Sequence, residues 1–126
     1  MKQYFGLALA MLAGAVLGAA AVDRLHAQAT SGAYAVVEID EITDVNAYAV
    51  LIKKAPAAAK AFGGRYVIRT QDIVATDGLP PKRIIVIAFD DMNKLKAWSA
   101  SPAQKEVDAI RVNSAQSRQF FVEGDY

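Results

Sequence analysis

An unbroken apolar run from Ile84 to Phe89 is the feature of this sequence that most constrains its fold. A strand with one wet face alternates apolar and polar residues, whereas an unbroken apolar run is typical of a strand whose two faces are both dry. Only two regions, around 43–62 and 90–114, have helical patterns, and in strand–helix–strand units both would cover the same face. We therefore expect a second copy of the protein to cover the other face.

The first 27 residues have the parts of an export signal. Lys2 supplies a positive start, Tyr4 to Val22 is apolar or glycine throughout, and Ala27-Gln28-Ala29 matches an Ala-x-Ala cleavage site. Cleavage after Ala27 fits about as well as cleavage after Ala29. The sequence therefore divides into a leader, 1–27, and one domain, 28–126.

The alternative for the leader is an uncleaved membrane anchor. Its apolar stretch approaches the roughly 20 residues that span a bilayer, and Gly14 to Gly18 matches the G-x-x-x-G pattern of packed membrane helices. We favour cleavage, because the stretch consists largely of alanine and glycine, which are weakly hydrophobic and common in cleaved leaders. We expect a periplasmic or secreted domain if the leader is removed, and a membrane-anchored domain that faces the periplasm if it is kept.

Composition excludes several kinds of chemistry for residues 28–126. The chain has no cysteine, and its one histidine, His26, lies in the leader. Cysteine–histidine and serine–histidine–aspartate catalysis, the usual zinc sites and histidine-bound haem are therefore excluded, and we expect no cofactor and no metal. The 14 basic and 13 acidic residues nearly balance. This balance argues against a nucleic-acid partner, which usually needs a basic face.

Local patterns predict four strands and two helical regions in the order β-α-β-β-α-β. Thr43 or Asp44 can cap the first helix, Gly63-Gly64 can end it, and Pro56 is expected to kink or split it. Asp90-Asp91 can cap the second helical region, and Ser101-Pro102 has the pattern of a new helix start, so this region is expected in two parts. The expected strands are 33–39, 65–69 with a continuation through Ile73 and Val74, 83–89 after the turn 76–81, and 118–123. This order is that of an α+β, ferredoxin-like sandwich.

Strand alternation places three charged residues on the sheet face away from the helices. Glu38 on the first strand, and Arg65 and Arg69 on the second, alternate with apolar residues that belong under the helices. A charged group on that face must be paired or must face a solvated cavity. One interpretation is a Glu38–Arg69 ion pair, or an arginine that reaches solvent. The other is a ligand pocket.

Four further residues are candidates for a ligand site. Tyr48 and Trp98 have core spacing on their helices, so each can pack in the core or line a pocket as a hydrogen-bond donor. Arg111 can pair with a carboxylate of its own helix or bind a ligand, and Asp77 can stabilise its turn or contact a ligand. The inward positions expected on the first helix are Val45, Tyr48, Ile52, Ala55, Ala59 and Phe62.

A series of short motifs resembles one bacterial family. The motifs are Gly63 to Arg69, Asp77-Gly78, Phe89, Ala97-Trp98, Ser101-Pro102, Arg111 and Glu123-Gly124. In order and spacing they resemble the domain of unknown function 1330 family, of the dimeric α+β barrel superfamily, over roughly Tyr34 to Gly124. The sequence departs from the usual family pattern at Thr70-Gln71, Asp77, Leu79, Ser99 and Gln104.

The resemblance implies a ferredoxin-like protomer whose sheet packs against a twin sheet to form a dimeric α+β barrel. Related branches of the superfamily include cofactor-free monooxygenases, lactone isomerases and haem-binding enzymes, with sites in the cleft between sheet and helices. The family itself has no established activity, so the resemblance assigns no catalytic residue to this sequence.

Two functional hypotheses follow. The first is a protein that binds or transforms a small organic molecule, with Glu38, Arg69 and Asp77 as polar anchors. The alternative is a non-catalytic periplasmic module whose only event is self-association. Both hypotheses expect a homodimer and no nucleic-acid partner. Both expect contact with a membrane only if the leader is uncleaved. The sequence leaves open whether the protein is an enzyme.

Overall fold

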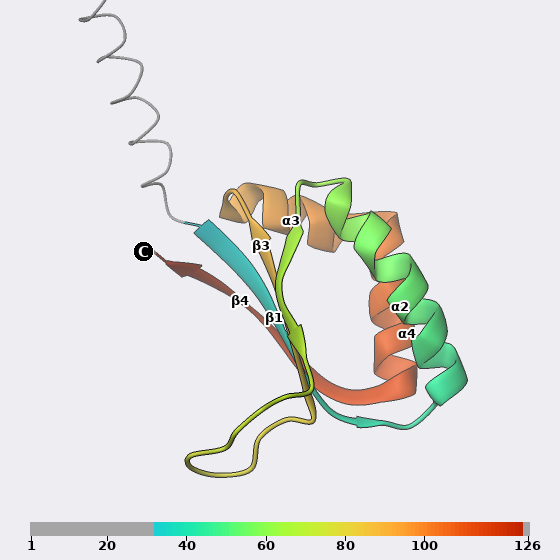
Figure 1. Ribbon diagram of the computed structural model, residues 1–126. Helices are drawn as coiled ribbons and strands as arrows, with labels where there is room; N and C mark the ends of the chain where they lie inside the picture. Colours follow the sequence, from blue (N-terminus) through green and yellow to red (C-terminus); the bar gives the residue numbers. More distant parts are fainter. Residues whose placement is uncertain (1–31, 125–126) are drawn as a thin grey trace, which may run out of the picture. The chain divides into compact units, whose positions relative to one another are not determined.

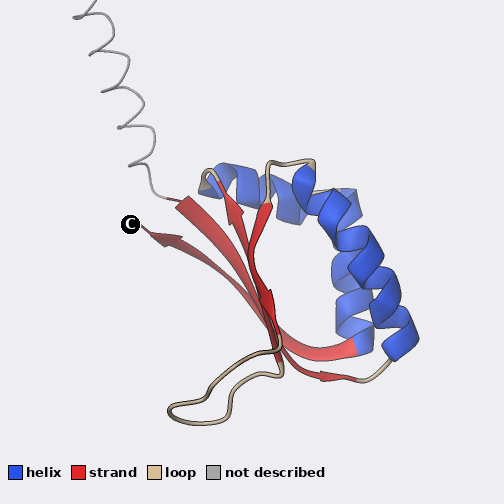
Figure 2. Ribbon diagram, viewed as in Figure 1, coloured by secondary structure: helices blue, strands red, loops and turns tan. Residues whose placement is uncertain are grey.

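The computed structural model describes residues 32–124, so the predicted leader and the predicted cleavage site lie outside the described residues. Within this range an antiparallel sheet carries all of its helices on one face, which gives two layers (Figures 1 and 2). The strands are β1 (Gly32–Ile42), β2 (Arg65–Thr70), β3 (Arg83–Phe89) and β4 (Ala115–Gly124). The sheet order is β2-β3-β1-β4, which places the first and third strands at the centre. No helix within 32–124 is long and apolar enough to cross a membrane.

The helices begin at the caps that the sequence predicts. Helix α2 (Val45–Lys60) is capped by Asp44, α3 (Met92–Ala100) by Asp91, and α4 (Pro102–Ser114) by Ser101. Each cap side chain accepts a hydrogen bond from the backbone N–H three residues later, which satisfies a donor that the helix leaves free. The second helical region therefore has two parts, and the order of elements is β-α-β-β-α-α-β.

Helix α2 differs from expectation in two ways. Of the kink or split expected at Pro56, the split is wrong, since the helix continues through the proline: side chains on both sides of it pack against the core and outweigh its local cost of about 3 kcal/mol. Its buried residues are Tyr48, Leu51, Ala58 and Ala59, whereas Val45 and Ile52 are 73% and 47% exposed. The helix is therefore rotated relative to the predicted apolar stripe, since its fit against α4 and the sheet decides which side is buried.

The core lies between the sheet and the helices, in two clusters. One joins Ala33, Ala35 and Phe89 of the sheet to Leu95 and Trp98 of α3. Phe89 and Trp98 pack with ring centroids 5.0 Å apart. The other cluster joins β1 to α2 and α4 through residues that include Val37, Ile39, Leu51 and Val107.

The strand register differs from simple alternation at β2. Tyr66 pairs with Ile87 and Ile68 with Val86, so Val67 is an extra residue without a partner, a β-bulge. Beyond the bulge Arg69 pairs with Ile85, and paired residues share a face. Arg69 therefore lies on the helix-covered face, and its predicted place beside Glu38 on the outer face is wrong. Strand β2 also ends at Thr70, before Ile73 and Val74.

The other face of the sheet carries apolar side chains that no helix covers. These residues come from all four strands, and they are Val36, Ile68, Val86, Phe120 and Val122. Ile68, Phe120 and Val122 are each exposed by more than 40%. The residues of β3 confirm that both of its faces are apolar. Within residues 32–124 the helices cover only one of these two faces.

Candidate ligand cavity

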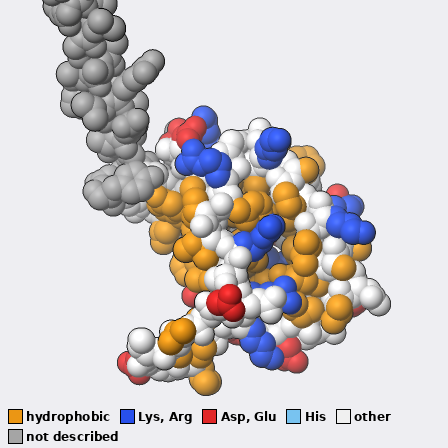
Figure 3. Space-filling view, in the orientation of Figure 1, with side chains coloured by type: hydrophobic (Ala, Val, Ile, Leu, Met, Phe, Trp, Pro, Cys, Tyr) orange, Lys and Arg blue, Asp and Glu red, His pale blue; other side chains and the backbone are white. Residues whose placement is uncertain are grey.

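A cavity of about 700 Å³ lies between the sheet and the helices. This volume is within the range of sites that hold small organic ligands. Figure 3 shows a hollow on this face of the molecule, with apolar side chains and Lys or Arg side chains beside it. Long polar side chains occupy several of the inward positions: Arg69 on β2, Arg83 on β3, and Gln104 and Arg111 on α4.

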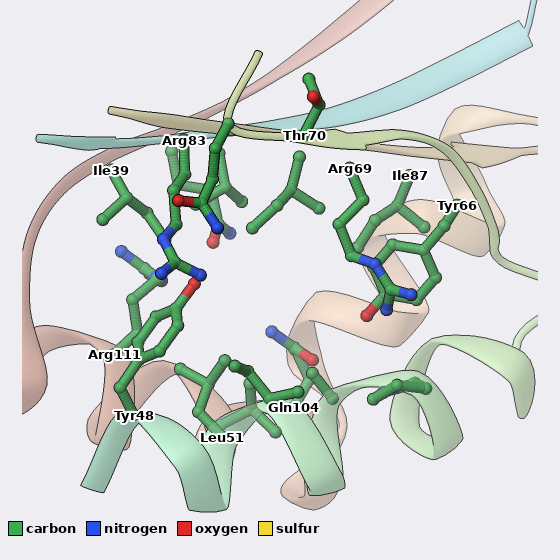
Figure 4. Close-up of a pocket in the computed structure, with 18 of the residues that line it drawn as sticks. Ile39, Tyr48, Leu51, Tyr66, Arg69, Thr70, Arg83, Ile87, Gln104 and Arg111 are labelled. Atoms are coloured by element: carbon green, nitrogen blue, oxygen red, sulfur yellow. The ribbon is translucent and has the colours of Figure 1, made fainter. Parts of the chain in front are cut away.

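Apolar side chains from both layers form slightly more than half of the cavity wall. Val37, Ile85 and Ile87 contribute from the central strands, and Leu51 and Val107 contribute from α2 and α4. Polar side chains form the rest: two groups of them lie at opposite ends of the cavity, and Gln104 lies between these groups (Figure 4). A wall that combines both kinds of group suits a ligand that has apolar and polar surface.

Tyr48, Arg83 and Arg111 lie at one end of the cavity (Figure 4). The guanidinium of Arg83 lies 5.4 Å from the centre of the Tyr48 ring, within cation–π range. Burial raises the pKa of Tyr48 above its ordinary value, and the charge and hydrogen bond of Arg83 oppose that rise. The Tyr48 hydroxyl is therefore protonated at neutral pH and can donate a hydrogen bond.

Tyr66 and Arg69 lie at the opposite end (Figure 4). The Arg69 guanidinium lies 5.3 Å from the centre of the Tyr66 ring. Burial also raises the pKa of Tyr66, against the positive charge of Arg69. Simple alternation would place these two residues on opposite faces of β2, and the bulge at Val67 brings them to the same face.

A hydrogen-bonded group on α4 supports one part of the wall. Asp108 accepts from Gln104 Nε2 at 3.0 Å and from Arg111 Nη2 at 3.3 Å. Arg111 Nη1 also donates to Ser117 Oγ of β4 at 2.9 Å. Arg111 thus pairs with a carboxylate of its own helix, as expected, and Asp108 holds Gln104 and Arg111 in place along the cavity.

Three buried polar atoms of cavity-lining residues have no hydrogen-bond partner within residues 32–124. They are Trp98 Nε1, Gln104 Oε1 and Arg111 Nε. Trp98 and Gln104 are 1% and 4% exposed, and an unpaired buried polar group costs about 1–3 kcal/mol. Neighbouring protein atoms cover each of these atoms, so two donors and one acceptor in side chains beside the cavity have no hydrogen-bond partner in the part of the chain that the structure describes.

Two of the predicted site residues lie elsewhere. Glu38 is on the outer face, where Arg118 donates to its Oε2 at 2.8 Å and also to Asp40. Its partner is thus Arg118, on the neighbouring strand β4, and not Arg69. Asp77 is exposed in the loop between β2 and β3 and does not line the cavity. The structure brings together Tyr48, Arg69, Trp98 and Arg111 of the predicted set.

Arg83, Gln104 and Tyr66 line the cavity, although they are not among the site residues that the sequence predicts. Arg83 directly precedes the apolar run of β3. Alternation places its side chain on the same face as Ile85 and Ile87, so its position on the helix-covered face could have been predicted. The sequence marks Gln104 only as a departure from the usual family pattern, although the residue is 4% exposed. A buried glutamine at that position could not be distinguished by pattern from a solvated one.

These features define an α+β domain of ferredoxin-like fold with a cavity between its layers. The chain belongs to the family described as domain of unknown function (DUF1330), whose model matches residues 32–125. Comparison with curated proteins found no match.

Solved structures with the same fold share little sequence with this chain. A dimeric ferredoxin-like protein of unknown function from Jannaschia sp. CCS1 is 13% identical, with a TM-score of 0.58 over 74% of this chain and 99% of that one. A second dimeric ferredoxin-like protein, from Thermobifida fusca, is 15% identical, with a TM-score of 0.54 over 77% and 92%. A mutant of SnoaB, a cofactor-independent oxygenase from Streptomyces nogalater, is 12% identical, with a TM-score of 0.51 over 75% and 92%.

Proposed function

We propose that this protein binds a small organic molecule in the cavity between its sheet and its helices. The observation that carries the proposal is a cavity of about 700 Å³ whose wall combines apolar side chains with the polar side chains of Tyr48, Arg83 and Gln104. A core built only for stability would fill such a space with close-packed side chains. A ligand with polar atoms and an apolar body would satisfy both parts of the wall.

We propose that the protein binds a molecule, and we assign it no chemical reaction. Tyr48 and Tyr66 are protonated at neutral pH because burial raises the pKa of each hydroxyl, so their first role is to donate hydrogen bonds. Any transformation would have to use acid–base chemistry of a carboxylate or a tyrosine, or reactivity that the bound molecule itself brings. The oxygenase among the solved structures shares the fold, and one fold hosts many activities.

A neutral fluorescent probe, N-phenyl-1-naphthylamine, tests the proposal together with a variant that fills the cavity. Ala55 lines the cavity on α2, whereas Ala57 on the same helix is exposed and does not. Ala55→Trp should abolish the probe's fluorescence increase, because the indole occupies the space. Ala57→Trp is the matched control and should bind as wild type does. No increase with wild type, or an equal increase with Ala55→Trp, would contradict cavity binding.

We also propose that a second copy of the chain covers the outer face of the sheet. Five apolar residues of that face, including Val86 at its centre, lie uncovered by any helix within residues 32–124. Burial of such a face against a twin would remove its apolar area from water. The two ferredoxin-like structures named above are described as dimeric, which supports a dimer here.

Export remains a proposal that rests on residues 1–27, whose pattern is that of a leader. The mass of the protein recovered from its own cells would test it. A mass that includes the leader would favour the membrane-anchored alternative.

A further inference from the structure

The charges on the cavity wall do not balance. Three arginines line the cavity, Arg69, Arg83 and Arg111, against one carboxylate, that of Asp72. Arg111 has an ion pair with Asp108, but within residues 32–124 neither Arg69 nor Arg83 has one. The cavity therefore has an excess of positive charge, although the whole chain is close to neutral.

The excess matters most at the end where Arg83 and Arg111 lie. Arg83 is half-buried, Arg111 is 14% exposed in its side chain, and apolar residues of β1 and α2 adjoin them. A guanidinium in such surroundings has lost part of its hydration, and an anion restores that loss through charge-assisted hydrogen bonds. Arg69, in contrast, is exposed, so water can solvate its charge.

The polar groups at this end of the cavity can donate hydrogen bonds, so they suit a ligand group that accepts them. Arg83 offers a planar fork that no described carboxylate occupies, and the Tyr48 hydroxyl lies at the same end of the cavity (Figure 4). Arginine forks match carboxylate and sulfonate oxygens well. The apolar part of the wall, formed by Ile85, Ile87, Leu51 and Val107, has no polar group for an inorganic ion but can pack against the body of an organic molecule.

We infer that the ligand is an organic anion, with its acidic group at the Arg83–Arg111–Tyr48 end and its apolar body along the central strands and α2. This inference rests on the proposed function, since it names the chemical class of the molecule that the cavity binds. It also gives Arg83 a role in specificity, because Arg83 has no ion-pair partner of its own within residues 32–124.

Two probes with one skeleton separate charge from shape. N-phenyl-1-naphthylamine is neutral, and 8-anilino-1-naphthalenesulfonate adds a sulfonate to the same rings. Each would be titrated into wild type, Arg83→Gln and Arg65→Gln, and the part that Ala55→Trp abolishes would be taken as cavity binding. Arg65 is the matched control, since it is an exposed arginine that pairs with Ala88 on the outer face.

The sulfonate should bind wild type more tightly than the neutral probe does. Arg83→Gln should weaken sulfonate binding about tenfold, as loss of a charged hydrogen bond implies, and should leave the neutral probe unchanged. Arg65→Gln should alter neither. Retained binding of the neutral probe also shows that the Arg83 variant is folded.

The inference fails if wild type binds the two probes equally, or if Arg83→Gln weakens both to the same extent. It also fails if millimolar inorganic phosphate displaces the sulfonate as readily as benzoate does, because the site would then be one for a bare ion. In each of these cases the neutral probe still binds the cavity, so the proposed function stands. If Arg83→Gln does not fold, the affinities of the two probes for wild type, measured at rising salt concentration, test the inference instead. Only the affinity for the sulfonate should fall, because salt screens its attraction to the arginines.

Discussion

At the scale of single residues, Gly64 shows how closely the chain packs where α2 returns to the sheet. A Cβ at this position would lie 2.9 Å from the carbonyl oxygen of Ala59 and 2.9 Å from Cε1 of Phe89. Phe89 is 2% exposed and packs on Trp98, so neither neighbour can move without disturbing the core. Gly63 beside it has a φ of 76°, which suits glycine because it has no side chain to clash.

Gly64→Ala should therefore destabilise the fold by about 1–3 kcal/mol, the usual cost of overpacking. Urea unfolding followed by circular dichroism would measure the change. Gly124→Ala is the matched control, because a Cβ there would meet nothing within 4 Å. Equal stabilities for the two variants would show that the close contacts at Gly64 are relieved without cost.

At the scale of elements, Ser101 joins α3 to α4. Its hydroxyl donates to the Trp98 carbonyl at 2.7 Å and accepts from the Gln104 backbone N–H at 3.2 Å. One side chain thus serves the end of one helix and the start of the next. Because Trp98 and Gln104 both line the cavity, this junction also sets where two of the unpaired polar atoms lie.

Ser101→Ala should cost about 1 kcal/mol of stability, as the loss of a helix cap usually does. Thermal unfolding would measure it, and affinity for the neutral probe should fall as well because the junction positions the cavity wall. Ser99→Ala, within α3, is the control and should be neutral or slightly stabilising, since alanine favours helix. A cap variant as stable as the Ser99 variant would contradict this role.

At the scale of the whole molecule, the helices cover one face of the sheet and leave the other apolar (Figure 2). The polar groups on that outer face are concentrated around Arg118, which bonds to Glu38 and Asp40. Val36, Val86 and Phe120 lie beside this group on adjacent strands. A twin sheet would thus meet an apolar centre with a charged border, the usual anatomy of an interface.

The purified protein should therefore sediment at twice the mass of its chain at micromolar concentration. Val86→Lys should raise the dimer dissociation constant at least about a hundredfold, because an unpaired ammonium would be buried. Val74→Lys is the control, since Val74 is 89% exposed in the loop after β2. A wild-type monomer, or a Val86→Lys dimer as tight as wild type, would contradict the proposed interface.

Several features of the molecule were determined by the sequence alone. Apolar runs, glycine and proline positions and cap residues act over a few neighbouring residues, so they predicted the four strands, the caps at Asp44 and Ser101, and the ferredoxin-like order. The unbroken run of β3 likewise indicated an apolar outer face. The family was recognisable from short motifs for the same reason, since their order and spacing survive in the sequence itself.

Other features were decided only by the tertiary structure, because they depend on residues far apart in sequence. The bulge at Val67 appears only when β2 pairs with β3, and it moves Arg69 to the helix-covered face. Glu38 finds Arg118 because β4 returns beside β1. The cavity likewise arises from the fit of α2 and α4 over the sheet, which leaves Gln104 buried and Arg83 without an ion pair within residues 32–124. Local patterns carry no information on such long-range fits, so the site could be predicted only in part.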